Sequence, residues 1–283
     1  MQFGAYMFCT DYSIRPDELA RLLEERNFES MWVPEHSHIP ASRQSPWPGG
    51  GELPREYWHT YDPFVALTAA AAVTTRLKLG TGICLMVERD PIVTAKEVAS
   101  LDQISNARFL FGIGGGWNAE EMGNHGTNFR RRWRVMRERI LAMKEIWTKD
   151  EAEFHGEFVD FDKMWAFPKP VQKPHPPIIM GGDGPTTFDR VVEYCDGWMP
   201  IGGRQWTANQ GPSLAEKIAF LKRQAEESGR DPDSISIGTF GIRPDPDLIG
   251  RMEDAGVERV VFALPSADRE AVLPILDQFV RFL

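Results

Sequence analysis

The stretches Phe109-Leu-Phe-Gly-Ile-Gly-Gly-Gly-Trp117 and Ile178-Ile-Met-Gly-Gly-Asp-Gly-Pro-Thr-Thr187 share one pattern. Each begins as a short apolar run, typical of a buried parallel strand, and passes through glycines into a helical pattern. Glycines let the backbone approach a ligand closely, and the N-terminus of a helix favours an anion. Together the two turns predict one phosphorylated cofactor. The residues that we expect to bind it are Gly114, Gly115, Gly116, Gly181 and Gly182, with a hydroxyl from Thr186 or Thr187.

An alternative interpretation applies to the second turn. Asp183 or Thr186 is also a suitable N-cap for the helix that follows, with the glycines serving only to tighten the turn. The first turn differs from the dinucleotide fingerprint, because no acidic residue closes a second strand about 20 residues further on. A nicotinamide-binding domain is therefore disfavoured.

Outward from these turns, strands and helices alternate along the chain, and one domain is expected over residues 1–283. Eight such units predict a closed (β/α)8 TIM barrel, because each right-handed crossover adds a neighbouring strand until the eighth meets the first. A proline-rich, aromatic segment, 149–177, predicts an insertion before strand five. The predicted strands are 2–9, 30–34, 77–85, 108–113, 177–181, 197–200, 234–239 and 258–264.

Composition narrows the class of ligand. The formal net charge is −9 and no long basic run occurs, which argues against nucleic acid and anionic membranes as partners and favours a small molecule. Cys9, Cys84 and Cys195 are widely spaced in apolar surroundings, as expected for free thiols in a reducing compartment. Neither a signal peptide nor an 18-residue apolar span is found, and we expect a cytoplasmic protein.

Long loops are expected at the carboxyl ends of the strands, where barrel enzymes place their active sites. They cover 35–60, 117–130 and 201–212, and loops of more than about 12 residues are usually functional or disordered. The first contains Trp47 and Tyr57 and is interpreted as a substrate wall or lid, with a surface loop as the alternative. With Trp117, Trp198 and Trp206, it suggests an apolar or planar substrate, although such tryptophans also cap cores.

Strand two ends in Val33-Pro-Glu-His-Ser-His38, which places an acid and two histidines at the predicted mouth. A His-x-His pair can chelate a metal, but the ends of strands five, six and eight add only Asp183, so no metal is expected. His36 is interpreted as a general acid or hydrogen-bond donor, with a structural histidine as the alternative. His38 is expected to be structural.

With these motifs in place, the sequence resembles the luciferase-like monooxygenase superfamily, and within it the oxidoreductases that use the deazaflavin coenzyme F420. The resemblance covers nearly the whole chain. It is carried by Trp32-Val-Pro-Glu-His36, Tyr61-Asp-Pro-Phe64, Leu79-Gly-Thr-Gly-Ile83, Gly112-Ile-Gly-Gly-Gly-Trp117-Asn-Ala-Glu120, and Gly181-Gly through Cys195-Asp-Gly-Trp198-Met-Pro200.

The resemblance implies residue roles. Glu35 and His36 match the acid and histidine after strand two, here expected to be catalytic, and a non-proline cis peptide at Gly82-Ile83 would support the flat ring. The phosphate-contacting turns match Gly114 to Gly116 and Gly181 to Gly182, and Trp117 joins the cofactor site. Sugar-phosphate dehydrogenases of the family carry a glutamate where Trp117-Asn118 stands here, which disfavours a sugar phosphate as substrate.

These observations predict hydride transfer between F420 and a small organic substrate, with His36 handling the proton. Arg130, Arg131 and Arg132 are candidate cations for the acidic F420 tail. The main alternative is an FMN-dependent two-component monooxygenase, which would need a partner reductase. Minor alternatives are a catalytically silent flavin-binding protein and a metal-dependent hydrolase. The family habit predicts a homodimer.

Overall fold

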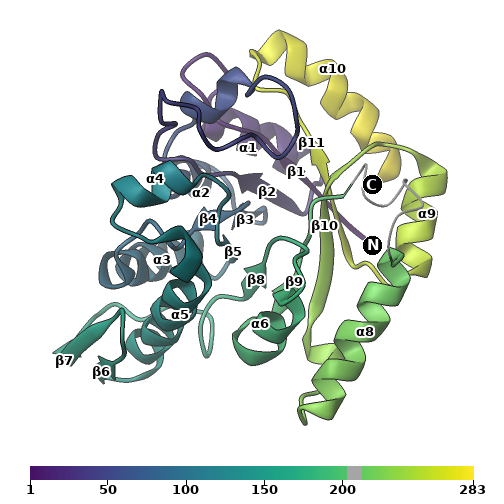
Figure 1. The fold of residues 1–283 in the computed structure, drawn as a ribbon. Helices are drawn as coiled ribbons and strands as arrows, with labels where there is room; N and C mark the ends of the chain where they lie inside the picture. The colour runs from purple at the N-terminus through teal and green to yellow at the C-terminus, as the bar shows by residue number, and fades with distance from the viewer. Residues whose placement is uncertain (203–211) are drawn as a thin grey trace.

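Parallel strands close on themselves at the centre of the computed structural model, which describes residues 1–202 and 212–283 (Figure 1). β1 pairs with β11 and β3 pairs with β5, so the sheet has no free edge between its first and last strands. The predicted TIM barrel with eight strand positions is confirmed over these residues. The barrel strands are β1 (Gln2–Tyr6), β2 (Ser30–Val33), β3 (Lys78–Thr81) continued by β4 (Cys84–Leu85), β5 (Phe109–Gly114), β8 (Ile178–Met180), β9 (Gly197–Trp198), β10 (Ser236–Ile242) and β11 (Arg259–Ala263).

Helices surround the barrel (Figure 1). Acidic or hydroxyl side chains begin several of them. Asp62 and Asp90 accept hydrogen bonds from backbone N–H groups in the first turns of α2 and α3, and each is followed by a proline that suits the first helical position. Ser213 and Glu216 form a capping box on α8. The helices are α1 (Pro16–Glu25), α2 (Pro63–Ala71), α3 (Pro91–Ser105), α4 (Ala119–Asn124), α5 (Arg132–Thr148), α6 (Thr187–Tyr194), α8 (Leu214–Glu227), α9 (Pro246–Asp254) and α10 (Arg269–Phe279).

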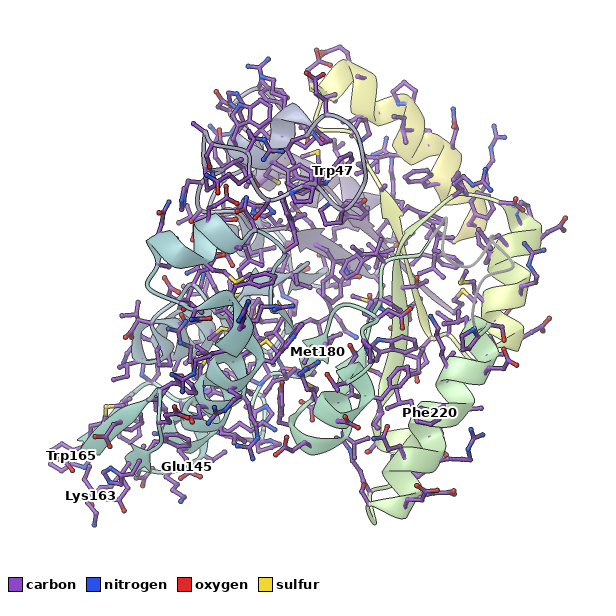
Figure 2. The ribbon with its side chains drawn as sticks, viewed as in Figure 1. Trp47, Glu145, Lys163, Trp165, Met180 and Phe220 are labelled. Atoms are coloured by element: carbon purple, nitrogen blue, oxygen red, sulfur yellow. The ribbon has the colours of Figure 1, made fainter. Side chains whose placement is uncertain are left out.

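The insertion before the fifth barrel strand is an antiparallel hairpin, β6 (Glu151–His155) and β7 (Asp160–Trp165). It projects from the barrel beside α5, and Trp165 and Lys163 lie near its outer end (Figures 1 and 2). The return segment is held against α3, because the Gln103 side chain donates a hydrogen bond of 2.8 Å to the carbonyl oxygen of Lys169. The predicted insertion is confirmed, although its strands had not been predicted.

The barrel interior is filled around Trp32, which is fully buried and packs edge-on against Phe240. Two glycines make room for it. A Cβ at Gly80 would lie 2.2 Å from the Trp32 ring, and one at Gly112 would lie 2.0 Å from the carbonyl oxygen of Thr81. These glycines therefore serve close packing of the strands.

The three cysteines are free and buried, as predicted, and burial raises the pKa of Cys9 to about 12. The described ranges contain no helix that is long and apolar enough to cross a membrane. The loop predicted over 117–130 in fact holds the short helix α4. Trp206 and most of the loop after β9 lie outside the described residues.

Candidate functional site

The carboxyl ends of the barrel strands enclose a cavity of about 130 Å³. One wall is formed by Gly82, Ile83, Gly181 and Gly182, and the facing wall is aromatic and apolar. The facing residues include Tyr6, Phe8, Tyr57 and Phe240. Tyr57 comes from the loop 35–60, where its ring packs 5.8 Å from the ring of Trp47. This loop therefore contributes a wall to the barrel cavity, as its aromatic content suggested.

Three of the sequence motifs meet at one side chain, Ile83. The Gly82–Ile83 peptide bond is cis, and it lies between β3 and β4. A Cβ at Gly114 would lie 1.8 Å from Ile83 Cδ1, and one at Gly181 would lie 2.9 Å from Ile83 Cγ2. The motifs after strands three, four and five are thus parts of a single arrangement, in which two glycines accommodate the Ile83 side chain.

The first glycine turn differs from the predicted arrangement. A Cβ at Gly115 would lie 2.6 Å from the Trp133 ring, and Gly116 has a φ of +63° that favours glycine. With Gly114 facing Ile83, packing within the chain accounts for the side-chain-free positions of this turn. Packing alone therefore explains why Gly114, Gly115 and Gly116 are glycines, and their contact with a phosphate stays a prediction.

The second glycine turn has free space beside its backbone at Gly182, whereas side chains pack against the first turn. Gly182 has a φ of +88° and nothing within 4 Å of an added Cβ. Thr187 accepts a hydrogen bond of 2.9 Å from the N–H of Gly184, and Thr186 accepts one of 2.5 Å from Arg190. Thr187 thus shapes the turn, and Thr186 connects it to a guanidinium group.

A positive charge gathers beside this second turn. The Arg190 guanidinium lies 3.9 Å above the ring of Trp133, which also packs against Arg132. Arg132 Nε is buried and makes no hydrogen bond within the described part of the chain. Burial first, and then the positive charge of the neighbouring Arg190, lower the pKa of Arg132. An anion placed between them would relieve this repulsion.

His36 is buried and is held by a carboxylate. Its Nδ1 lies 2.7 Å from Glu121 Oε2, and its ring packs against the rings of Tyr57 and Trp117 at 5.2 Å and 5.7 Å. A carboxylate at Nδ1 makes this nitrogen the donor and leaves Nε2 for a reacting group. Asn118 caps α4 by accepting from the N–H of Glu121 at 3.1 Å, which fixes the position of that carboxylate.

The structure places His36 in a different cavity from the one expected. It lines a hollow of about 450 Å³ beside the barrel mouth, and its ring contacts the ring of Tyr57, which lines the central cavity. His38 bonds Ser37 Oγ at 2.9 Å and Asn124 at 2.7 Å on the surface. No group of three or more potential metal ligands occurs in the ranges that the structure describes.

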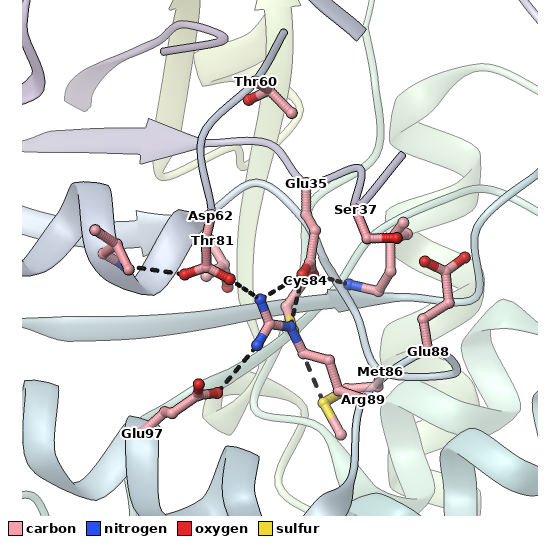
Figure 3. A network of polar contacts seen from close by, with 12 residues as sticks. Glu35, Ser37, Thr60, Asp62, Thr81, Cys84, Met86, Glu88, Arg89 and Glu97 are labelled. Carbon is pink, nitrogen blue, oxygen red and sulfur yellow. Dashed lines mark hydrogen bonds and ion pairs between the residues drawn. The ribbon is translucent and has the colours of Figure 1, made fainter. Parts of the chain in front are cut away.

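Glu35, for which a catalytic role was predicted, takes part in a network of hydrogen bonds and ion pairs (Figure 3). The N–H of Leu85 donates to its Oε2 at 2.6 Å, and Arg89 Nε donates to its Oε1 at 2.6 Å. Arg89 also pairs with Asp62 and, at 3.0 Å, with Glu97. Glu35 therefore ties the end of β2 to β4 and, through Arg89, to the starts of α2 and α3.

Sequence reasoning missed Arg89 and Glu121. Both act on partners far away in the sequence, so no local pattern indicates the pairing. A weak local signal existed for Glu121, since Asn118 is a helix N-cap and Glu121 stands three residues later, as in a capping signature. Its complete burial is what marks it as functional.

A barrel with an apolar cavity at its mouth and a carboxylate-bound histidine nearby is an arrangement that suits a flavin-type oxidoreductase. Residues 16–243 match the model of the luciferase-like monooxygenase family, and the chain belongs to this family. An uncharacterized protein of Mycobacterium tuberculosis is 39% identical over 277 residues, which cover 96% of this chain and 94% of that protein.

Two further similarities concern the cofactor. The FMNH2-dependent dimethylsulfone monooxygenase of Pseudomonas putida is 30% identical over 207 residues, covering 72% of this chain and 53% of the relative. The solved structure of an F420-dependent secondary alcohol dehydrogenase, in complex with an F420–acetone adduct, superposes with a TM-score of 0.77 at 19% identity, covering 100% of this chain and 98% of that one. An FMNH2-dependent protein is thus similar to this chain in sequence, and an F420-dependent protein is similar to it in fold.

Proposed function

We propose that this protein is an F420-dependent oxidoreductase that moves a hydride between the deazaflavin and a small organic substrate. The observation that carries the proposal is the pair Arg132 and Arg190 beside the open second glycine turn. F420 carries a phosphate and an acidic tail, and two guanidinium groups that form no ion pair with a carboxylate in the described ranges suit such a chain. The solved F420-dependent alcohol dehydrogenase supports it by showing that this fold, at nearly the same length, holds F420.

The residues present fit the cofactor at both of its ends. Ile83 and its flanking glycines offer a flat apolar shelf for a ring, and the turn at Gly182 leaves the backbone accessible to a phosphate. When bound, F420 would supply or accept the hydride. Arg132 and Arg190 would hold the anionic end.

The chain's own residues would then manage the proton and the solvent. His36 would give a proton to the substrate or take one from it at Nε2, while Glu121 keeps the proton on Nδ1. The aromatic side chains of Tyr6, Phe8 and Tyr57 line the cavity and would limit the access of water to a bound substrate. Glu35 would hold the loop that positions His36 rather than touch the substrate.

A second candidate function is an FMN-dependent monooxygenase supplied with reduced flavin by a partner reductase. The identity of 30% with the dimethylsulfone monooxygenase of Pseudomonas putida favours it. FMN ends at its phosphate and lacks the acidic tail, so it makes less use of two arginines. Binding of the two cofactors therefore discriminates the proposals.

Changing Arg132 to Gln should weaken binding of oxidised F420 about tenfold or more, because a hydrogen bond to a charged group contributes about 1.5–3 kcal/mol. The loss should shrink as salt is raised, since screening weakens the wild-type contact. Fluorescence titration measures both. Arg134 is a matched control, because it sits on the same helix and pairs with Glu157. Equal losses in R132Q and R134Q would contradict the assignment.

The homodimer remains a proposal, and α2 and α3 carry the surface that supports it. Val65, Val93 and Ile104 are 70%, 57% and 55% exposed, and a hollow of about 650 Å³ lies between the two helices. Contiguous apolar exposure of this kind marks interaction sites. V93D should shift the protein from dimer to monomer in sedimentation, whereas F220D on α8 should not. A monomeric wild type would contradict the proposal.

A further inference from the structure

Two buried carboxyl groups lie behind His36, on the side away from the barrel cavity. Glu121 has no exposed surface, and the side chain of Glu88 is 4% exposed. Buried acids are uncommon unless they are paired with a cation or hold a proton. The two groups reach their places from different elements, since Glu121 belongs to α4 and Glu88 follows β4.

Glu121 uses both of its oxygens. Oε2 accepts from His36 Nδ1 at 2.7 Å, and Oε1 accepts from the N–H of Ser37 at 3.0 Å. A carboxylate is the side chain of this size that offers two acceptors, so both neighbouring N–H groups are satisfied. His36 is consequently fixed in rotation and in the nitrogen that carries its proton.

Glu88 is placed against Glu121, and His125 Nε2 lies 4.0 Å from its Oε2. Both of its carboxyl oxygens are buried and make no hydrogen bond to the described residues. Its Oε1 would lie 4.0 Å from a Cβ added at Gly116, so the group sits beneath the first glycine turn. Burial first, and then the negative charges of Glu121 and Glu35, raise the pKa of Glu88 to about 9.

The charged groups that face Glu88 come from several elements. Glu121 approaches from α4 and Glu35 from the end of β2, while Arg89 adjoins it in the chain and Arg139 faces it from α5. Arg89 is already engaged by three carboxylates, and Arg139 donates to the carbonyl oxygen of Met86 at 2.9 Å. Neither arginine forms an ion pair with Glu88 in the described ranges, and the carboxyl remains in a negative environment.

A route leads from this pair to the outside. His125 Nε2 lies 4.0 Å from Glu88 Oε2 and 2.7 Å from Ser37 Oγ, and its side chain is about one third exposed. His36, Ser37, Glu88 and His125 line the same hollow of about 450 Å³. This hollow is large enough for several water molecules, which could connect the partly exposed His125 with the buried carboxyl.

We infer that Glu121 and Glu88 are positioning residues that govern proton transfer by His36, with Glu121 fixing the imidazole tautomer and Glu88 kept neutral behind it. The inference rests on the proposed function insofar as His36 handles a substrate proton. When a substrate O–H bond breaks, its proton moves to Nε2, the Nδ1–H stays on Glu121, and the imidazolium is balanced by that one carboxylate. In the reverse direction, the Nε2–H bond breaks and the proton returns to the substrate oxygen.

A neutral Glu88 matters because it limits the negative charge behind the histidine to one carboxylate. A second anion there would hold the Nε2 proton more strongly and slow its release to the substrate. Glutamine reproduces the neutral form of Glu88, so the pH profile of kcat for E88Q should lack the fall that ionisation of Glu88 causes at high pH in the wild type. E121Q should lower kcat about tenfold or more with little change in KM, because its amide can accept from only one of the two N–H groups.

The direct test is the ¹⁵N NMR spectrum of the His36 ring in the free protein, which needs neither cofactor nor substrate. Wild type should show a protonated Nδ1 and a non-protonated Nε2 for the neutral ring. E121Q should lose part of this pattern, and E227Q, which changes an exposed glutamate on α8, should keep it. An unchanged His36 pattern in E121Q would overturn the inference, whether or not the protein turns out to use F420.

Glu88 is tested through the pH dependence of stability. Its pKa rises from 4.5 to about 9 on folding, so between these values the folded protein retains a proton that the unfolded chain releases, and stability falls as pH rises. Glutamine removes this dependence. The thermal midpoint of E88Q should therefore exceed that of wild type by an amount that grows from about pH 5 to about pH 8. A difference that is constant with pH would overturn a neutral Glu88.

Discussion

R89M should lose about 3–5 kcal/mol of the free energy of unfolding, because removing one partner from a buried ion-pair network leaves uncompensated charge. Arg89 is the shared partner of Glu35, Asp62 and Glu97, and its side chain is 15% exposed while that of Glu35 is 6% exposed. Methionine keeps much of the apolar stem, so the loss reports the charge rather than a cavity.

Urea unfolding measures this loss, and its pH dependence identifies the cause. Burial raises the pKa of Glu97 while Arg89 lowers it, so without the arginine the pKa should rise further. A carboxyl group whose pKa is raised by folding destabilises the protein once the pH exceeds the pKa that the group has in the unfolded chain. The difference in free energy of unfolding between R89M and wild type should therefore become smaller below about pH 4. R281M, at an exposed arginine, is the control. A loss below about 1 kcal/mol would contradict this prediction, because the network would then stabilise the fold no more than exposed ion pairs do.

The second large effect concerns His36. H36N should lower kcat for F420-linked turnover by about 10²–10⁴-fold, the usual contribution of a positioned acid or base, while the Kd for F420 changes little. Asparagine can still donate to Glu121, so the loop geometry should be retained. Single-turnover reduction of F420 with a panel of secondary alcohols separates binding from chemistry.

H38N provides the control for this experiment. His38 lies two residues away on the surface and bonds Ser37 and Asn124, so its substitution should leave kcat within experimental error. Equal losses in H36N and H38N would point to a structural role for the segment. A catalytically silent flavin-binding protein would bind F420 in both variants and show no turnover in wild type.

The periodicity of the chain was sufficient to predict the barrel and its insertion. Strand and helix periods depend on local patterns of burial, and the closing contact between β1 and β11 follows once eight units are counted. The glycine motifs also fell at one place, as strand-end motifs must in a parallel barrel. Their meeting point at Ile83 required the three-dimensional register.

The contacts that define the site could not be predicted in the same way. Glu35 was expected to be catalytic from the family resemblance, and its ion pair with Arg89, 54 residues away, could not be predicted from local sequence. Glu121 is 85 residues from His36. Such pairs depend on how loops pack over the barrel, and a single sequence carries no periodic pattern for them. The same holds for the contact between the rings of Tyr57 and His36.

We expect the open second turn, with Arg132 and Arg190, to bind the acidic end of F420. The most direct test is a parallel fluorescence titration of the protein with oxidised F420 and with FMN, in the same buffer at low salt. F420 should bind saturably with a lower Kd than FMN, and R132Q should raise the Kd for F420. Tighter binding of FMN, unaffected by R132Q, would contradict it and favour a monooxygenase supplied by a partner reductase.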